Sequence, residues 1–218
     1  YTITDASGNT ATCAFSVTIS DTEAPVIACP ENITQDNDTD ACAAAVMWTA
    51  PTATDNCSQV MTSTHDSGST FAVGTTTVTY TSADEAGNSA TCSFDITVSD
   101  AQDPVIACPA DIVQGTDAGS CDAVVTYAAP VGTDNCPNPV TELVAGLASG
   151  STFPIGSTDV TYSVTDAAGN AVSCTFSVTI EDTELPVIAN CPTSITEVND
   201  AGVCEAAISW TAPSATDN

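Results

Sequence analysis

The sequence predicts an all-β protein of tandem β-sandwich modules joined end to end, each about 80 residues long. Three observations lead to this prediction: a recurring segment, cysteines at constant spacing, and alternation of apolar with small polar residues. The segment DTEAPVIACP at 21–30 returns as AQDPVIACP at 101–109 and as DTELPVIANCP at 182–192. Cys29, Cys108 and Cys191 mark one position in it, 79 and then 83 residues apart. A unit of this length is a small domain.

The repeat divides the chain into four parts. Two modules are complete, at 21–99 and 100–181. Residues 1–20 match 80–99 and are expected to be the C-terminal part of a module, containing its last two strands. Residues 182–218 match the first two strands of a module. We therefore expect the chain to be a segment of a longer array.

The alternation of residue types predicts the strands. At 90–98, Phe94, Ile96 and Val98 fall on one face, and the same pattern recurs at 13–19 and 174–180. Val, Ile and Thr dominate these runs, as half-buried strands favour, and no helical pattern is present. In the first complete module we expect strands at 25–34, 42–49, about 60–64, 76–82 and 90–98, with a short link at 69–74.

Several ordered motifs together resemble one family. DTEAPVIACP, DACAAAVMWTAPTATDNC and GSTFAVGTTTVTYTSADEAGNSATCSFDITVSD are similar to the hyalin repeat (HYR) module. The second module repeats them as GSCDAVVTYAAPVGTDNC, GSTFPIGSTDVTYSVTDAAGN and AVSCTFSVTIED. The resemblance implies an immunoglobulin-like β-sandwich that occurs in tandem in extracellular and adhesion proteins. It implies adhesive or structural work rather than catalysis, and it names no partner.

Eleven cysteines at repeated positions predict disulfides and an extracellular or cell-surface location. Zinc is disfavoured because the chain has no CxxC motif and only one histidine, His65. Four cysteines in a module allow three connectivities. The immunoglobulin-like resemblance, in which the first and last strands share one edge, implies the bridges Cys29–Cys92 and Cys108–Cys174, and leaves Cys42–Cys57 and Cys121–Cys136.

The net charge of −28 arises without a single Lys or Arg. Binding of nucleic acid through phosphate neutralisation is thereby excluded. No Lys or Arg salt bridge can form, so carboxylate repulsion must be relieved by solvent, salt or bound cations. An acidic, solvated surface is the alternative to a cation site.

Acidic residues gather at the linker, the loop after the second strand and the turn between the last two strands. In the implied sandwich these three features meet at one pole, where carboxylates could bind Ca²⁺. The candidate ligands are Asp21, Glu23, Asp55, Asp84 and Asn88, then Asp100, Asp103, Asp134, Asp166 and Asn170, and finally Asp182, Glu184 and Asp217. Taken singly, DAAGN is also an ordinary tight turn and TDNC an Asx turn.

An enzymatic function is not expected. The repeated acids lie in turns and linkers that water reaches, and His65 has no counterpart in the second module. Trp48, Tyr127 and Trp210 are in phase with a core face, so we interpret them as structural rather than as a sugar-binding platform.

The function predicted from these features is an extracellular structural or adhesive repeat array, a segment of a fibre or surface filament with calcium-stiffened joints. Its partners would be neighbouring modules, copies of itself, or a surface protein or glycan. Two alternatives remain: a ligand-binding adhesin or receptor ectodomain, and spacer modules beside an enzyme outside this segment. No membrane span is present in the segment.

Overall fold

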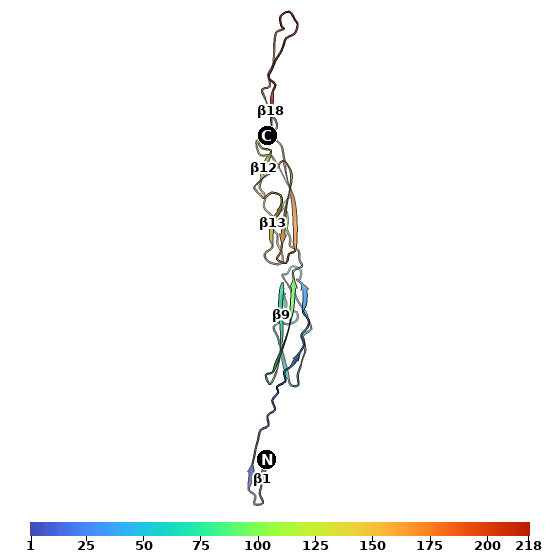
Figure 1. The fold of residues 1–218 in the computed structure, drawn as a ribbon, viewed down its shortest axis with the longest axis vertical. Helices are drawn as coiled ribbons and strands as arrows, with labels where there is room; N and C mark the ends of the chain where they lie inside the picture. The colour runs from blue at the N-terminus through green and yellow to red at the C-terminus, as the bar shows by residue number, and fades with distance from the viewer. The chain divides into compact units, whose positions relative to one another are not determined.

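The computed structural model describes residues 1–218 and consists of β-strands, turns and extended segments (Figure 1). It separates into a first unit, Tyr1–Asp100, and a second unit, Ala101–Asn218. The first unit contains β1 (Thr2–Thr4), β2 (Thr10–Thr12), β3 (Val26–Ile27), β4 (Ile33–Asp36), β5 (Ala43–Ala45), β6 (Ala53–Thr54), β7 (Gln59–Ser63), β8 (Thr70–Ala72), β9 (Gly74–Asp84) and β10 (Ser89–Ser99). The second contains β11 (Ile112–Gly115), β12 (Asp122–Val125), β13 (Val140–Ala145), β14 (Ser151–Pro154), β15 (Gly156–Thr165), β16 (Ala171–Glu181), β17 (Val187–Ala189) and β18 (Ser214–Thr216).

The first sandwich, β3–β10, contains a four-stranded sheet in the order β4-β10-β9-β7. β4 runs parallel to β10, whereas β9 is antiparallel to both β10 and β7. The pairs β3–β6 and β5–β8 complete the module. The core between the layers joins Ala44, Val46 and Phe71 to side chains of β9 and β10.

The second sandwich, β11–β16, repeats this arrangement. Its four-stranded sheet has the order β11-β16-β15-β13, and β12 pairs with β14. A bridge between Val105 and Thr133 replaces the β3–β6 pair. Its core joins Ala123, Val125 and Phe153 to side chains of β15 and β16. The prediction of an all-β chain of tandem immunoglobulin-like sandwiches is confirmed.

The predicted core faces of the last strands are confirmed as well. Phe94, Ile96 and Val98 are at most 3% exposed, and their neighbours along β10 point outward. In the middle of the first sandwich, Trp48 donates a hydrogen bond from Nε1 to the Tyr80 hydroxyl at 2.8 Å. Trp48 therefore has a structural role in the first sandwich, as its phase predicted.

Three details of the predicted strands were wrong. The expected strand at 25–34 is divided into β3 and β4, which belong to different sheets, and Pro30 between them has no N–H for a ladder. The strand expected at 42–49 ends at Ala45, after which Trp48 donates its backbone N–H to the Ser67 hydroxyl. The link expected at 69–74 contains β8, whose Phe71 enters the core.

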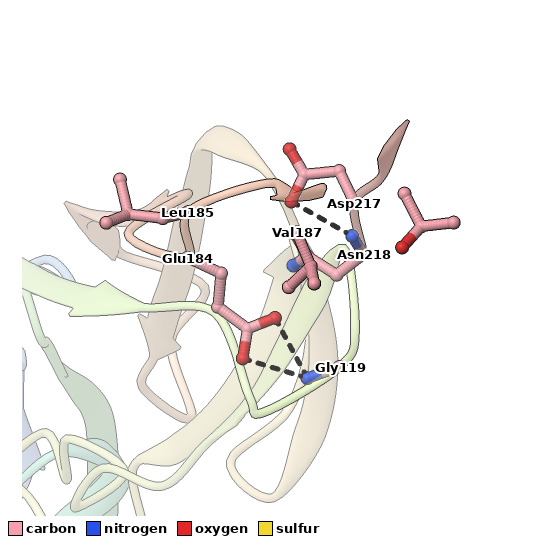
Figure 2. Close-up of a pocket in the computed structure, with 7 residues that line it drawn as sticks. Gly119, Glu184, Leu185, Val187, Asp217 and Asn218 are labelled. Carbon is pink, nitrogen blue, oxygen red and sulfur yellow. Dashed lines mark hydrogen bonds between the residues drawn. The ribbon is translucent and has the colours of Figure 1, made fainter. Parts of the chain in front are cut away.

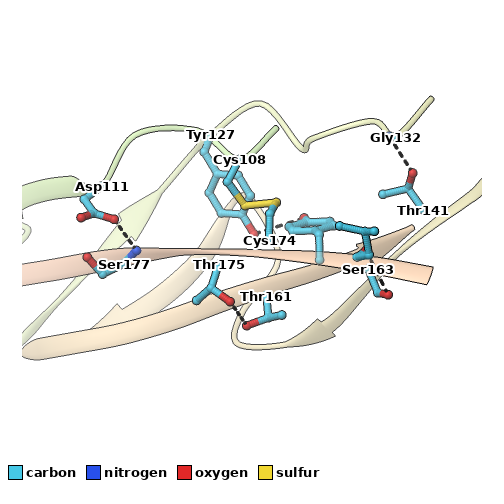
Figure 3. Close-up of a disulfide and its surroundings, with 12 residues drawn as sticks. Cys108, Asp111, Tyr127, Gly132, Thr141, Thr161, Ser163, Cys174, Thr175 and Ser177 are labelled. Atoms are coloured by element: carbon cyan, nitrogen blue, oxygen red, sulfur yellow. Dashed lines mark hydrogen bonds between the residues drawn. A yellow bond between two sulfur atoms is a disulfide. The ribbon is translucent and has the colours of Figure 1, made fainter. Parts of the chain in front are cut away.

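Each of the two sandwiches contains one disulfide. Cys29 is bonded to Cys92 and Cys108 to Cys174, with Cα atoms 5.6 Å apart in both bridges. Figure 3 shows the second bridge beside Tyr127 and the inner strand β16, where the Ser177 N–H donates to Asp111 Oδ1 at 2.8 Å. These bridges are the ones that the resemblance implied.

The other two predicted bridges, Cys42–Cys57 and Cys121–Cys136, are not formed. Cys57 and Cys121 are exposed free thiols, whereas Cys42 and Cys136 are both disulfide-bonded. The physical reason lies within each sandwich. The Cys42 carbonyl accepts the Val73 N–H before β9 begins, while Gln59, two residues after Cys57, pairs with Asp84, where β9 ends.

Candidate cation site

The turn Asp84–Asn88 joins β9 to β10 and fixes one carboxylate of the candidate site. Asn88 donates its backbone N–H to Asp84 Oδ1 and its side-chain amide to Oδ2, both at 2.8 Å. Gly87 adopts φ +96°, a left-handed conformation that favours glycine. The sequence DEAGN therefore builds the turn locally, and Asp84 is left only 8% exposed.

Two further carboxylates meet Asp84 at this end of the first sandwich. Asp21 lies in the segment that enters the sandwich, and Asp55 directly follows β6. One oxygen from each of the three side chains lies within 4.8 Å of the others. The structure thus brings together a linker residue, a loop residue and a turn residue that are up to 63 positions apart in sequence.

The carboxylates of this cluster are incompletely satisfied. Asp21 Oδ2 and Asp55 Oδ1 are buried and accept no hydrogen bond. A buried oxygen without a donor loses its hydration without compensation, and neighbouring negative charges repel each other. Because the chain has no Lys or Arg, no side-chain ammonium or guanidinium group can neutralise them. A bound cation would supply the missing interactions.

The cluster also affects Cys57, which lies beside it. Interaction with the Cys57 thiol, followed by the hydrogen bond from the Glu23 N–H, lowers the pKa of Asp21. The same Asp21 contact, partial burial and the nearby carboxylates raise the pKa of Cys57 to about 11. The site therefore has a negative potential, which favours a cation and keeps the free thiol protonated.

Not all predicted ligands of the first set join the cluster. Glu23 is exposed and lies outside it, and its backbone N–H donates to Asp21 Oδ1 at 3.1 Å. Asn88 acts as a donor, because its side-chain amide also contacts the Asp21 backbone carbonyl at 3.3 Å. The cluster gathers one oxygen from each of three carboxylates, so Ca²⁺, which takes six to eight oxygens, would need further oxygens from backbone carbonyls or water.

Sequence reasoning missed one residue beside the cluster. Asn56 donates its side-chain amide to Asp21 Oδ1 at 3.4 Å and so connects the loop after β6 to the entering segment. The sequence contains a signal for Asn56, because the tripeptide TDN that ends in it recurs at 54–56, 133–135 and 216–218.

In the second unit the turn is rebuilt with the same contacts. Asp166 accepts the Asn170 N–H at 2.8 Å and the Asn170 side-chain amide at 2.7 Å. Burial raises the pKa of Asp166, but the hydrogen bonds from Asn170 and Gly169 outweigh it and leave the pKa below 3.8.

The other predicted ligands of the second set are not part of this turn. Asp134 accepts the Cys136 N–H at 2.9 Å, and Asp103 is exposed. Asp100 is the last residue of the first unit, so the predicted second set is divided between the units.

The predicted third set lies within the second unit and forms a different site. Both Glu184 carboxylate oxygens accept the Gly119 N–H at 3.1 Å, as Figure 2 shows. Asp182 accepts the Glu184 N–H, and Asp217 accepts the Asn218 N–H. The Asn218 side-chain amide donates to the Ser120 carbonyl. An open pocket of about 280 Å³ lies between Gly119, Glu184 and Asn218, and Asp182 is not among its lining residues.

Comparison with known protein families identifies two repeated domains in the chain. The sequence pattern of the HYR domain matches residues 20–98 and 99–180.

The structure contains no helix with the length and hydropathy that crossing a membrane requires.

Two curated relatives are named hyalin. The chain is 41% identical to hyalin of Strongylocentrotus purpuratus over 229 aligned residues, covering all of this chain and 19% of the relative. It is 35% identical to hyalin of Lytechinus variegatus, covering all of this chain and 42% of the relative. The chain thus spans less than half the length of either protein.

Among solved structures, extracellular cadherin domains 3–6 of protocadherin gamma B2 align with 76% of this chain and 55% of their own. The sequence identity is 14% and the TM-score 0.38, which is too low to establish a closer structural relationship.

Proposed function

Because the chain belongs to the HYR domain family, we propose that it is part of an extracellular structural or adhesive repeat array with calcium-binding joints. The tandem family matches and the disulfides support the extracellular repeat. In this proposal the array is a fibre or surface filament, and its partners are neighbouring modules, other copies and surface molecules. The predicted module boundaries, 21–99 and 100–181, belong to the same proposal.

The observation that carries the calcium proposal is the cluster of Asp21, Asp55 and Asp84. Its members come from the segment entering the first sandwich, a loop and a turn, so one ion would cross-link all three. Ca²⁺ suits the site because it takes six to eight oxygens in flexible geometry. Bound Ca²⁺ would restrain the entering segment and stiffen the array at that point.

A catalytic role is not part of this proposal. The three clustered acids come from turns and loops, and no nucleophile with an adjacent base accompanies them. Cys57, the neighbouring thiol, has a pKa raised to about 11, which is the opposite of an activated nucleophile.

Calorimetric titration tests the calcium site. The chain is stripped with EDTA, dialysed and titrated with CaCl₂ in buffered NaCl. We expect saturable binding at the first sandwich and a higher melting temperature on loading. Asp55→Asn keeps the shape of the side chain but removes a charge, and it should weaken this site at least about tenfold, since even indirect partners of a metal typically matter by that factor.

Glu31→Gln is the matched control, because it removes one charge from an exposed position outside the cluster. It should leave the affinity unchanged. Equal effects of both substitutions, or equal effects of CaCl₂ and of NaCl at matched ionic strength, would show general charge screening and would overturn the calcium site.

A further inference from the structure

Three asparagines of the first module begin the tripeptide Asn-x-Ser/Thr, which is the acceptor sequence for N-linked carbohydrate. They are Asn32, Asn37 and Asn56, and no other acceptor tripeptide occurs in the chain. An N-linked glycan is bulky and hydrated, so the folded module has to present the modified nitrogen to solvent. The side-chain hydrogen bonds of the three asparagines distinguish the one that meets this requirement.

Asn32 uses only its side-chain oxygen in the fold. Oδ1 accepts the Asp95 N–H at 2.9 Å, directly before the parallel pairing of β4 with β10 begins at Ile33 and Ile96. The side-chain nitrogen donates no hydrogen bond, and the residue is exposed. The nitrogen of Asn32 therefore takes no part in holding the two strands together.

The second sandwich shows that this position needs an oxygen and not an amide. Asp111 occupies the place of Asn32 in the repeat, and its Oδ1 accepts the Ser177 N–H at 2.8 Å (Figure 3). This contact also lies directly before the parallel pairing of the edge strand, here β11 with β16. Aspartate thus makes the same contact without a side-chain nitrogen, so the fold does not require the amide of Asn32.

The other two asparagines use their side-chain nitrogens. Asn37 is half-buried, and its Nδ2 donates to the Ala41 carbonyl at 2.8 Å. The third module repeats this contact at Asn199, which begins no acceptor tripeptide, so the contact belongs to the fold. Asn56 donates from Nδ2 to Asp21 Oδ1 at 3.4 Å, beside the acidic cluster. A sugar would replace one hydrogen atom on either nitrogen and crowd these contacts.

From these contacts we infer that Asn32 carries an N-linked glycan, whereas Asn37 and Asn56 remain unmodified. Thr34, which completes the acceptor tripeptide, is exposed on β4, the edge strand of the four-stranded sheet. The glycan would therefore stand beside an edge whose backbone groups could otherwise pair with another chain. The inference rests on the extracellular location in the proposed function, because the sugar is transferred in the secretory route. It does not use the calcium site.

The transfer joins the Asn32 nitrogen to the first sugar of an oligosaccharide that is bound to a lipid diphosphate. A bond forms between Nδ2 and the anomeric carbon of that sugar. The bond from the anomeric carbon to the diphosphate oxygen breaks, and the lipid diphosphate leaves. Nδ2 gives up one of its protons to a base of the transferring enzyme, and no oxidant or reductant takes part.

Secretion of the chain from animal cells, with mass spectrometry of the intact protein before and after peptide:N-glycosidase digestion, tests the site. We expect one N-linked glycan on the unsubstituted chain. Asn32→Asp should remove it and keep the contact with Asp95, because Asp111 makes the equivalent contact in the second sandwich. Thr34→Val should also remove the glycan, whereas Thr34→Ser should keep it, because serine still completes the acceptor tripeptide.

Thr39→Val and Ser58→Ala are the matched controls. They destroy the other two acceptor tripeptides without changing their asparagines, and both variants should keep the glycan. An unsubstituted chain without N-linked carbohydrate, or carbohydrate that persists in Asn32→Asp, would overturn the inference. Secretion with the Cys29–Cys92 bridge closed but without a glycan would contradict this inference alone. Retention in the cell with reduced cysteines would instead contradict the extracellular location on which it rests.

Discussion

Residues 1–20 and 80–99 have closely similar sequences but differ sharply in structure. Tyr80 and Phe94 are 4% and 3% exposed, whereas their counterparts Tyr1 and Phe15 are 85% and 68% exposed. β10 is 11 residues long, while β2, at the equivalent place, has only three. The turns, in contrast, are the same: Asn9 donates to Asp5 as Asn88 donates to Asp84.

This difference separates features that form from local interactions from features that require packing against other strands. The turn forms in both regions because its hydrogen bonds connect residues four positions apart. The long strands form only in the sandwich, where Phe71 and Val46 from other strands cover their apolar face. Alternation of residue types therefore provides a face that can be buried, and the second layer decides whether it is buried.

The largest difference in stability should appear when the two equivalent phenylalanines, Phe94 and Phe15, are replaced by alanine. Phe94→Ala creates a cavity in the first core and should lower the free energy of unfolding by about 3–5 kcal/mol. Phe15→Ala should change it by less than about 0.5 kcal/mol, because the ring is exposed. Urea unfolding followed by Trp48 fluorescence measures both. A comparable loss in the two variants would mean that residues 1–20 are packed in solution.

The cysteines at the same equivalent positions give a second contrast. Replacing Cys29 and Cys92 together by Ala removes the bridge across the first sandwich and should cost about 2–5 kcal/mol. Cys13→Ala, the counterpart of Cys92 in the exposed segment, should have little effect because Cys13 is a free thiol. Denaturant titration without reductant compares them, and equal midpoints would indicate that the bridge does not stabilise the module.

The smallest effect concerns the turns themselves. Hydrogen bonds from Asn9, chiefly from its side chain, lower the pKa of Asp5, and those from Asn170 offset burial to lower that of Asp166. A lowered folded pKa stabilises the turn above the ordinary value of 3.8, and this contribution is lost as the pH falls through the folded pKa. Carboxyl NMR titration should find a pKa below 3.8 for both groups. If Asp166 had a lowered pKa but Asp5 titrated normally, the turn would need a surrounding sandwich in order to form.

Sequence reasoning predicted the features that depend on short-range patterns. The phases of Phe94 and Phe176, the turns and the approach of Asp21, Asp55 and Asp84 all follow from alternation, turn chemistry and the family resemblance. It could not place β8, because three residues around Phe71 are too few to show a period. It also assigned Cys42 to Cys57, because counting cysteines within a module says nothing about which end of a sandwich each one occupies.

The bridge between Cys29 and Cys92 sets a limit on how far a module could lengthen under tension. It spans 63 residues, and a pulling force would cross the sulfur–sulfur bond instead of unravelling the chain that the bridge encloses. From Cys92 to Cys108, the equivalent of Cys29 in the next module, there are only 16 residues, which extend to about 50–60 Å at 3.3–3.6 Å each. The 79-residue repeat would reach about 260–280 Å without the bridge. An oxidised array would therefore behave as a nearly inextensible tether, and reduction would turn it into a compliant one.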